Sequence, residues 1–171
     1  ILDSSLLEIF EGNITEIKTL EPDWATEIIR KSVSVKANVV SQDEKETMGL
    51  RILLNYGHTV GHALEVVTGF GRYLHGEAVS IGMMAAAHIS RSMDLLSDDD
   101  VRRQERILRG YGLPIDFSGI EIETILEAMK SDKKTSDGSI NWVLLDEIGH
   151  SVTSDQVPQE FVNDALLKVR S

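Results

Sequence analysis

The residues best suited to chemistry lie in one segment of the chain, residues 50–67. On a helical wheel at about 100° per residue, five polar side chains of this segment fall within an arc of roughly 80°: Arg51, Asn55, His58, His62 and Glu65. The opposite side is an apolar band, which predicts packing against a core. A solvated helix face usually carries Lys and Glu, so a face with an amide and two imidazoles predicts a functional site.

His58 and His62 are spaced so that both can reach one ion or one substrate. At positions i and i+4 of a helix their imidazoles lie one above the other, which suits a divalent metal. Gly57 and Gly61 flank them, and because glycine costs about 1 kcal/mol in a helix relative to alanine, this pair predicts the close approach of another helix or a ligand. A satisfied pair of core histidines beside a Gly-x-x-x-Gly packing seam explains the same pattern equally well.

A third histidine is predicted to join this pair. His75 stands between a glycine-containing loop, residues 69–73, and a predicted helix over residues 76–94 that is rich in small residues. If this helix packs along residues 50–67, three histidines converge. The alternative for His75 is a helix-capping role, and Glu77 is interpreted as a first-turn acid that favours the positive end of the helix dipole.

Weaker candidates lie outside these segments. Lys36 falls on a long predicted helix upstream, where a lysine usually lies at the surface with its stem along apolar neighbours. Lys133 and Lys134 follow a predicted helix end, where cations complement the dipole. His88 and His150 are interpreted as structural residues.

The composition limits the classes of function open to the chain. Its 171 residues include 17 Lys+Arg against 28 Asp+Glu, which gives a formal net charge of −11. Such an acidic chain is expected to bind no nucleic acid and no anionic membrane, because these partners need clustered Lys and Arg. Cysteine is absent, which excludes a thiolate metal site and agrees with a cytoplasmic location. No apolar stretch approaches the length of a membrane span.

The remaining signals predict the frame that must position the histidines. Helices are expected from periodic apolar residues and from N-terminal caps or prolines, at residues 2–20 (one or two short helices), 22–46, 97–110 and 121–131 and after Pro158. Only residues 140–145 predict a strand, paired with residues 151–153. The chain is therefore predicted to be a single, mainly α domain over residues 1–171, with one small β-hairpin near the C-terminus.

Two segments together resemble the signature of the 3-dehydroquinate synthase family. They read LRILLNYGHTVGHALE at residues 50–65 and LHGEAVSIGM at residues 74–83. The resemblance extends to four shorter matches: KA at 36–37, DEKE at 43–46, GLP at 112–114 and DKK at 132–134. It therefore covers nearly the whole chain, as the C-terminal domain of that family.

This resemblance implies a multihelical dehydroquinate-synthase-like C-terminal domain within a two-domain, homodimeric, cytoplasmic enzyme. In the family an N-terminal α/β domain binds NAD, and the helical domain holds a divalent metal, zinc or cobalt. The family's enzyme converts 3-deoxy-D-arabino-heptulosonate 7-phosphate, a phosphorylated sugar acid, to 3-dehydroquinate and phosphate in the shikimate pathway of aromatic amino acid biosynthesis. The expected partners are therefore this small molecule and the N-terminal domain.

The resemblance also implies a role for each histidine of the two segments. His58 and His75 resemble metal ligands. His62 resembles a substrate group near the phosphate that can relay a proton, and Asn55 resembles a second contact on the phosphate side.

The cationic candidates resemble groups that bind the rest of the substrate. Arg51 and Lys36 resemble the clamp for the substrate's carboxylate, for which a bidentate guanidinium is apt. One of Lys133 and Lys134 is expected to reach the substrate.

The chain departs from the family at the third metal ligand. In the family this ligand is the Glu of a Glu-x-x-Lys motif, which the resemblance places just before the first helix, and the chain begins after it, at Ile1. A catalytic zinc site normally has three protein ligands. The chain is therefore expected to be a fragment that holds metal weakly and is inactive alone.

Three other functions compete with the synthase. Another sugar-phosphate cyclase, such as 2-deoxy-scyllo-inosose synthase, uses the same metal and NAD but a substrate without a carboxylate, so Arg51 and Lys36 argue against it. A glycerol-dehydrogenase-type polyol dehydrogenase stops at oxidation and does not need the phosphate-side residues. A helical interaction module without catalysis would bind no metal.

Overall fold

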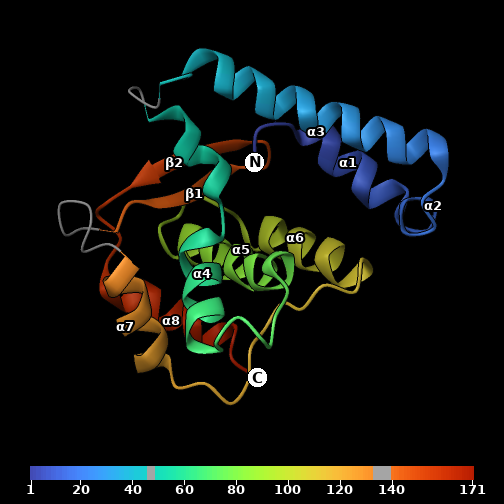
Figure 1. The fold of residues 1–171 in the computed structure, drawn as a ribbon. Coiled ribbons are helices and arrows are strands. Elements are labelled where there is room, and N and C mark those ends of the chain that lie inside the picture. Colours follow the sequence, from blue (N-terminus) through green and yellow to red (C-terminus); the bar gives the residue numbers. More distant parts are fainter. Residues whose placement is uncertain (46–48, 133–139) are drawn as a thin grey trace.

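In the described part of the chain, several helices and a hairpin pack around one central helix, while the N-terminal helices of residues 4–42 lie together at one side (Figure 1). The computed structural model describes residues 1–45, 49–132 and 140–171. In chain order its elements are α1 (Ser4–Gly12), α2 (Ile14–Lys18), α3 (Pro22–Gln42), the 3-10 helix η1 (Leu50–Asn55), α4 (His58–Val67), α5 (His75–Ser92), α6 (Asp98–Gly110), α7 (Ile122–Asp132), β1 (Trp142–Glu147), β2 (His150–Ser154) and α8 (Gln159–Lys168). The predicted mainly α fold with one hairpin is confirmed.

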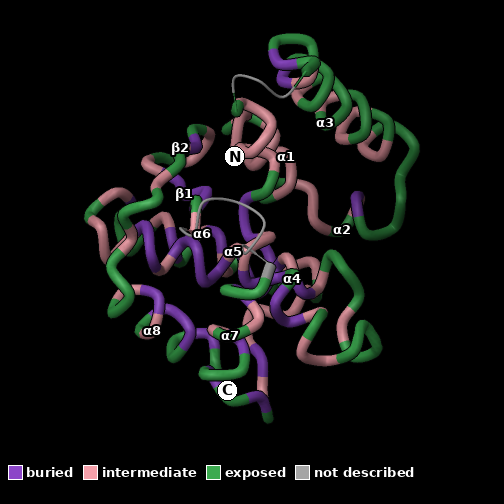
Figure 2. Tube along the Cα trace, turned by 60° about the vertical axis from the view of Figure 1, so that its left-hand side comes forward, coloured by how far each residue is buried: buried purple, intermediate pink, exposed green. Residues whose placement is uncertain are grey.

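The core is built around α5, which packs against α4, α6, α8 and β1. Ile81, Ala85 and Ile89 of α5 have no exposed surface, and each buried isoleucine stabilises the fold by about 1.5–3 kcal/mol. Figure 2 shows the buried residues concentrated along α5, whereas most of α3 is exposed. Among the described helices, none combines the length and the apolar character that crossing a bilayer requires.

Glycines let α4 and α5 approach each other closely. A Cβ built on Gly82 of α5 would overlap the carbonyl oxygen of Gly57, and one built on Gly61 of α4 would lie 3.1 Å from the Cα of Val79. The predicted close approach of another helix to Gly57 and Gly61 is therefore confirmed. This contact determines how far apart the side chains of the two helices lie.

The prediction of one continuous helix over residues 50–67 is wrong. The segment forms η1 up to Asn55 and then α4 from His58. The break lies at Gly57, whose φ of +82° is a left-handed conformation that glycine adopts at little cost. Arg51 and Asn55 therefore do not share a helix face with the histidines.

Most of the other predicted boundaries agree with the structure within a few residues. The helix expected over residues 22–46 ends earlier, at Gln42, and residues 46–48 lie outside the described part of the chain. The strand expected from residue 140 begins at Trp142, and its register pairs Leu144 with Val152 and Glu147 with His150.

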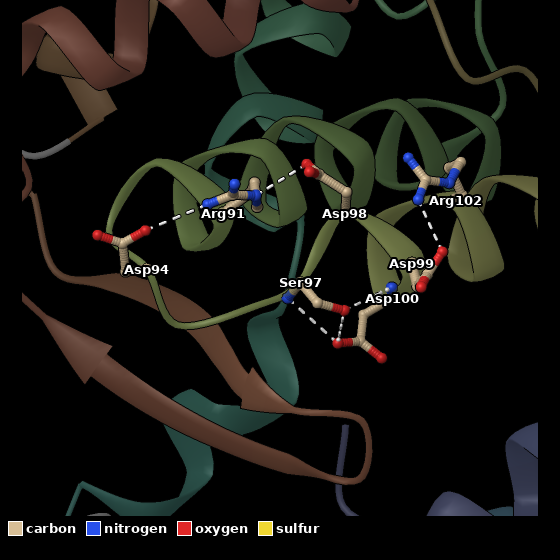
Figure 3. A network of polar contacts seen from close by, with 7 residues as sticks. All are labelled: Arg91, Asp94, Ser97, Asp98, Asp99, Asp100 and Arg102. Carbon is tan, nitrogen blue, oxygen red and sulfur yellow. Dashed lines mark hydrogen bonds and ion pairs between the residues drawn. The ribbon is translucent and has the colours of Figure 1, made fainter.

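The helix predicted from residue 97 is confirmed as α6, and Ser97 is its N-cap. The Oγ of Ser97 accepts a hydrogen bond from the backbone N–H of Asp100 at 3.1 Å, and the Asp100 carboxylate accepts one from the Ser97 N–H at 3.2 Å (Figure 3). Arg91, near the end of α5, donates to Asp98 at 2.8 Å. These contacts hold the turn between α5 and α6, although an exposed ion pair of this kind stabilises a protein by only about 0–1 kcal/mol.

Candidate metal centre and substrate cleft

Three histidines converge where α4 meets the start of α5. The ring centroids of His58 and His62 are 5.3 Å apart, those of His58 and His75 are also 5.3 Å apart, and those of His62 and His75 are 5.8 Å apart. One ring nitrogen of each lies within 4.8 Å of the others. The predicted convergence is confirmed, and the cluster offers the nitrogen donors that zinc and cobalt accept.

The local chain conformation explains how each histidine reaches the cluster. His58 is the first residue of α4, directly after the break at Gly57, and His62 follows one turn later on the same helix. His75 is the first residue of α5. The expected first-turn acid of α5 is confirmed, because the Glu77 carboxylate accepts a hydrogen bond from the Leu74 N–H at 2.8 Å.

His58 is half-buried and is held through its Nδ1 atom. This nitrogen lies 3.3 Å from the backbone carbonyl oxygen of Tyr56. A carbonyl oxygen only accepts hydrogen bonds, so Nδ1 carries the proton and Nε2 keeps its lone pair. Burial lowers the pKa of His58, and the neighbouring His62 and His75 lower it further against the opposing effects of Tyr56 and Glu65. A lowered pKa favours the neutral imidazole, the form that binds metal.

His75 is held in the same way by a different group. Its Nδ1 lies 3.2 Å from each carboxylate oxygen of Glu65, a residue near the end of α4. The His75 side chain is 58% exposed, whereas that of Glu65 is only 12% exposed. A carboxylate also accepts only, so here too Nδ1 donates and Nε2 is left for another partner.

His62 differs from the other two histidines. It is exposed, and in the described part of the chain its contacts are the ring contacts with His58 and His75, with no hydrogen bond to either ring nitrogen. Ligating histidines almost always donate their second ring N–H to a carboxylate, a backbone carbonyl or water. His58 and His75 make such a contact with the protein, whereas His62 is hydrogen-bonded to no described residue.

A cleft of about 600 Å³ lies next to His58. The side chains of Lys36 and Arg51 give it two cationic groups, and both come from elements that pack together, α3 and η1. The described residues that line it are Lys36, Asp43, Gly49, Arg51, Ile52, Leu54, Asn55 and His58. These two cations outnumber the one carboxylate of the described lining, that of Asp43, which favours an anionic ligand. A guanidinium can bind a carboxylate with two hydrogen bonds.

Four of the predicted site residues therefore line one cleft, although not for the reason that the sequence pattern indicated. Lys36, Arg51 and Asn55 reach it from α3 and η1, and His58 reaches it from the start of α4. His58 borders both the cleft and the histidine cluster, so a ligand in the cleft would lie next to a metal held by the cluster.

Sequence reasoning assigned no role to two residues of this region. Asp43 is 2% exposed, lines the cleft and accepts a hydrogen bond from the Leu50 N–H at 2.9 Å, which ties the end of α3 to η1. Its position in the DEKE match was the only signal in the sequence. The helical wheel placed Glu65 on the same face as His58 and His62. Its contact with His75 could not be read from the wheel, because the loop between α4 and α5 brings the two residues together.

The remaining candidates lie elsewhere or are not described. Lys133 and Lys134 lie outside the described residues, so their expected contact with a substrate stays a prediction. His150 forms a hydrogen bond with Asp146 at 2.6 Å in the hairpin. His88 lies half-buried on α5. Both agree with the structural reading.

The comparison with known protein families identifies the C-terminal part of one enzyme. The model of the family described as 3-dehydroquinate synthase C-terminal matches residues 1–135. The chain is 41% identical over 169 residues to the 3-dehydroquinate synthase of Acaryochloris marina, which covers 97% of this chain and 45% of that protein. It is also 42% identical over 162 residues to the 3-dehydroquinate synthase of Thermoanaerobacter pseudethanolicus. This alignment covers 95% of this chain and 45% of that protein. The chain thus spans somewhat less than half the length of these relatives.

Solved structures show the same fold. The chain matches 2-epi-5-epi-valiolone synthase from Streptomyces hygroscopicus subsp. jinggangensis, solved with NAD+ and Zn2+, with a TM-score of 0.85, 23% identity and coverage of 99% of this chain and 47% of that one. It matches 2-deoxy-scyllo-inosose synthase, solved with carbaglucose-6-phosphate, NAD+ and Co2+, with a TM-score of 0.71, 27% identity and coverage of 83% and 41%. At 23% identity the first match supports the fold alone.

Proposed function

This chain belongs to the 3-dehydroquinate synthase family, as its C-terminal part, and on that premise we propose that it supplies the metal and substrate residues of an NAD-dependent 3-dehydroquinate synthase. The enzyme would convert 3-deoxy-D-arabino-heptulosonate 7-phosphate to 3-dehydroquinate and phosphate in the shikimate pathway. The observation that carries this proposal is a cluster of three histidines, one ring nitrogen of each lying within 4.8 Å of the others, next to a cleft lined by Lys36 and Arg51.

His58 and His75 bind a divalent metal, zinc or cobalt, through their Nε2 atoms. The donor set supports this assignment, because the Nδ1 atoms of both are engaged by acceptors, the Tyr56 carbonyl and the Glu65 carboxylate. When bound, the metal supplies Lewis-acid polarisation of a substrate hydroxyl, and NAD supplies reversible hydride transfer.

His62 faces the substrate and moves a proton near the phosphate. Its ring lies beside the two ligands, with centroid distances of 5.3 and 5.8 Å. Neither of its ring nitrogens is hydrogen-bonded to a described residue, so either can exchange a proton with a ligand. An imidazole suits this role because histidine is the side chain that most often acts as general acid and base.

The cleft orients the substrate. Lys36 and Arg51 bind its carboxylate, and the amide of Asn55 makes a contact on the phosphate side. One of Lys133 and Lys134 adds a further cation. Holding both ends of the substrate in this way fixes the reacting carbons relative to the metal, which lowers the entropic part of the barrier.

The other parts of the enzyme lie outside this chain. An N-terminal domain binds NAD, and the assembled protein is a cytoplasmic homodimer. The relatives support the need for a second domain, because the chain spans 45% of their length.

A related cyclase that acts on a sugar phosphate without a carboxylate is the second candidate. The match to 2-deoxy-scyllo-inosose synthase at 27% identity favours it. The two cations of the cleft favour the carboxylated substrate instead, and so do the relatives at 41% and 42% identity.

Phosphate release tests the proposal and separates the two candidates. The assay joins this segment to an NAD-binding N-terminal half and supplies NAD and zinc or cobalt. We expect release of phosphate from 3-deoxy-D-arabino-heptulosonate 7-phosphate and none from glucose 6-phosphate. A His62→Gln variant should keep metal affinity and lose turnover. Turnover of glucose 6-phosphate alone would establish the second candidate.

A further inference from the structure

We propose that Glu65 is a positioning residue of the metal centre: its carboxylate holds the Nδ1–H of His75 and so directs the Nε2 of His75 toward the metal. This inference rests on the proposed function, since it needs His75 to be a ligand. It assigns a role to a side chain that would not itself touch the metal or the substrate.

The geometry of the contact supports this role. Both carboxylate oxygens of Glu65 lie 3.2 Å from the Nδ1 of His75. In the described part of the chain, His75 is the hydrogen-bond partner of the Glu65 side chain, and no lysine or arginine forms an ion pair with it. In the described structure, the one hydrogen-bond partner of the Glu65 carboxylate is therefore the Nδ1–H of His75.

Burial makes the contact different from an ordinary surface pair. The Glu65 side chain is only 12% exposed, and a carboxylate withdrawn from water is costly unless it is paired. The His75 side chain is 58% exposed, so packing alone does not fix the orientation of its ring. The buried carboxylate of Glu65 thus fixes the orientation of the exposed His75 ring.

The other proposed ligand, His58, is also held through its Nδ1 atom, but by a different acceptor. His58 donates its Nδ1–H to the backbone carbonyl of Tyr56 at 3.3 Å. In both residues the Nδ1 is engaged and the Nε2 is left for the metal, so the two ligands are prepared alike. A backbone carbonyl cannot be removed by substitution, whereas Glu65 can be changed.

Glu65 is not positioned as a ligand itself. The group of residues whose donor atoms lie close enough to share one ion comprises the three histidines, and within the described residues it includes no carboxylate. Substitution of a carboxylate that orients a ligating histidine typically reduces metal affinity about 10- to 100-fold. Loss of a ligand would abolish binding.

The test measures zinc affinity by calorimetry and the ring tautomer of His75 by nitrogen-15 NMR of the metal-free chain. In the wild type we expect the neutral ring of His75 to carry its proton on Nδ1. Glu65→Leu should remove this preference and weaken zinc binding about 10- to 100-fold. Glu65→Gln, whose amide oxygen still accepts, should restore part of both.

A matched control is available in the hairpin. The Asp146 carboxylate accepts from the Nδ1 of His150 at 2.6 Å, a contact of the same kind outside the cluster. Asp146→Leu should leave zinc affinity and the tautomer of His75 unchanged. If it weakens zinc binding as much as Glu65→Leu does, the effect is general and the inference is wrong.

The outcomes distinguish this inference from the proposed function. If His75→Ala leaves zinc binding unchanged, the metal site itself is wrong. If His75→Ala abolishes binding while Glu65→Leu does not weaken it, the site stands and the role of Glu65 is overturned. If Glu65→Gln abolishes binding as completely as His75→Ala does, Glu65 is a ligand and the positioning role is overturned. Should Glu65→Leu fail to fold, Glu65→Gln and the wild-type tautomer still decide the question.

Discussion

The Cα of Gly82 faces the carbonyl oxygen of Gly57 so closely that no Cβ fits between them. Gly57 precedes His58, and Gly82 belongs to the helix that His75 begins. The contact between these two glycines therefore determines the spacing of the two proposed metal ligands. Packing of α4 against α5 and assembly of the histidine cluster are one structural event.

Gly82→Ala should therefore damage both the fold and the metal site. The added methyl group forces α4 and α5 apart, and overpacking of this kind costs about 1–3 kcal/mol of unfolding free energy. We expect a lower urea midpoint and weaker zinc binding. Gly76→Ala on the same helix is the control, because a Cβ there has open space around it; it should be neutral or stabilise the protein by up to about 1 kcal/mol. Equal behaviour of the two variants would contradict the account.

Lys36→Met should weaken substrate binding without affecting the metal. Lys36 lines the cleft, and a hydrogen bond to a charged group is worth about 1.5–3 kcal/mol, so kcat/KM of the assembled enzyme should fall about 10- to 100-fold. Zinc affinity should stay unchanged. Lys31→Met is the control on the same helix, because Lys31 contacts Ser5 and Asp3 instead. Unchanged kinetics in Lys36→Met would remove Lys36 from the substrate site.

Much of this site could be predicted from the sequence because its signals are local. The spacing of His58 and His62 follows from helical periodicity, and the small residues after His75 indicated a closely packed helix. The break at Gly57 could not be predicted, since a glycine is compatible with a continuous helix and with a left-handed turn. The apolar periodicity of residues 50–67 is therefore the same whether the helix continues through Gly57 or breaks there.

Long-range contacts account for what the sequence did not indicate. Asp43 is charged and yet 2% exposed, and its hydrogen bond to the Leu50 N–H depends on how α3 meets η1. Glu65 pairs with a residue ten positions away, across a loop. Neither contact produces a periodic pattern in the sequence. Lys133 and Lys134 remain predictions from resemblance alone.

Stability should fall as the pH drops below about 6.5, in part because of His88. Burial lowers the pKa of this imidazole below its ordinary value of 6.5, and the positive charge of Lys168 lowers it further against the opposing effect of Glu105. As the pH falls, the unfolded chain takes up this proton first, so the unfolded state gains stability. Above the ordinary pKa the effect vanishes.

Urea unfolding across this pH range measures the effect. His88→Gln should lose less stability between about pH 7.5 and pH 5 than the wild type does. His150→Gln is the control, because His150 is exposed in the hairpin. An acid loss of stability that is identical in the wild type and His88→Gln would show that His88 does not contribute.

The central claim is that His58 and His75 bind one metal ion together. Calorimetric titration of this chain with zinc and with cobalt tests it most directly, alongside a His58→Ala, His75→Ala double variant and a His88→Ala, His150→Ala double variant. The account predicts one-site binding that the first double variant abolishes and the second retains. Identical binding by the wild type and the first double variant would contradict the account, and the metal site would have to be sought elsewhere in the chain.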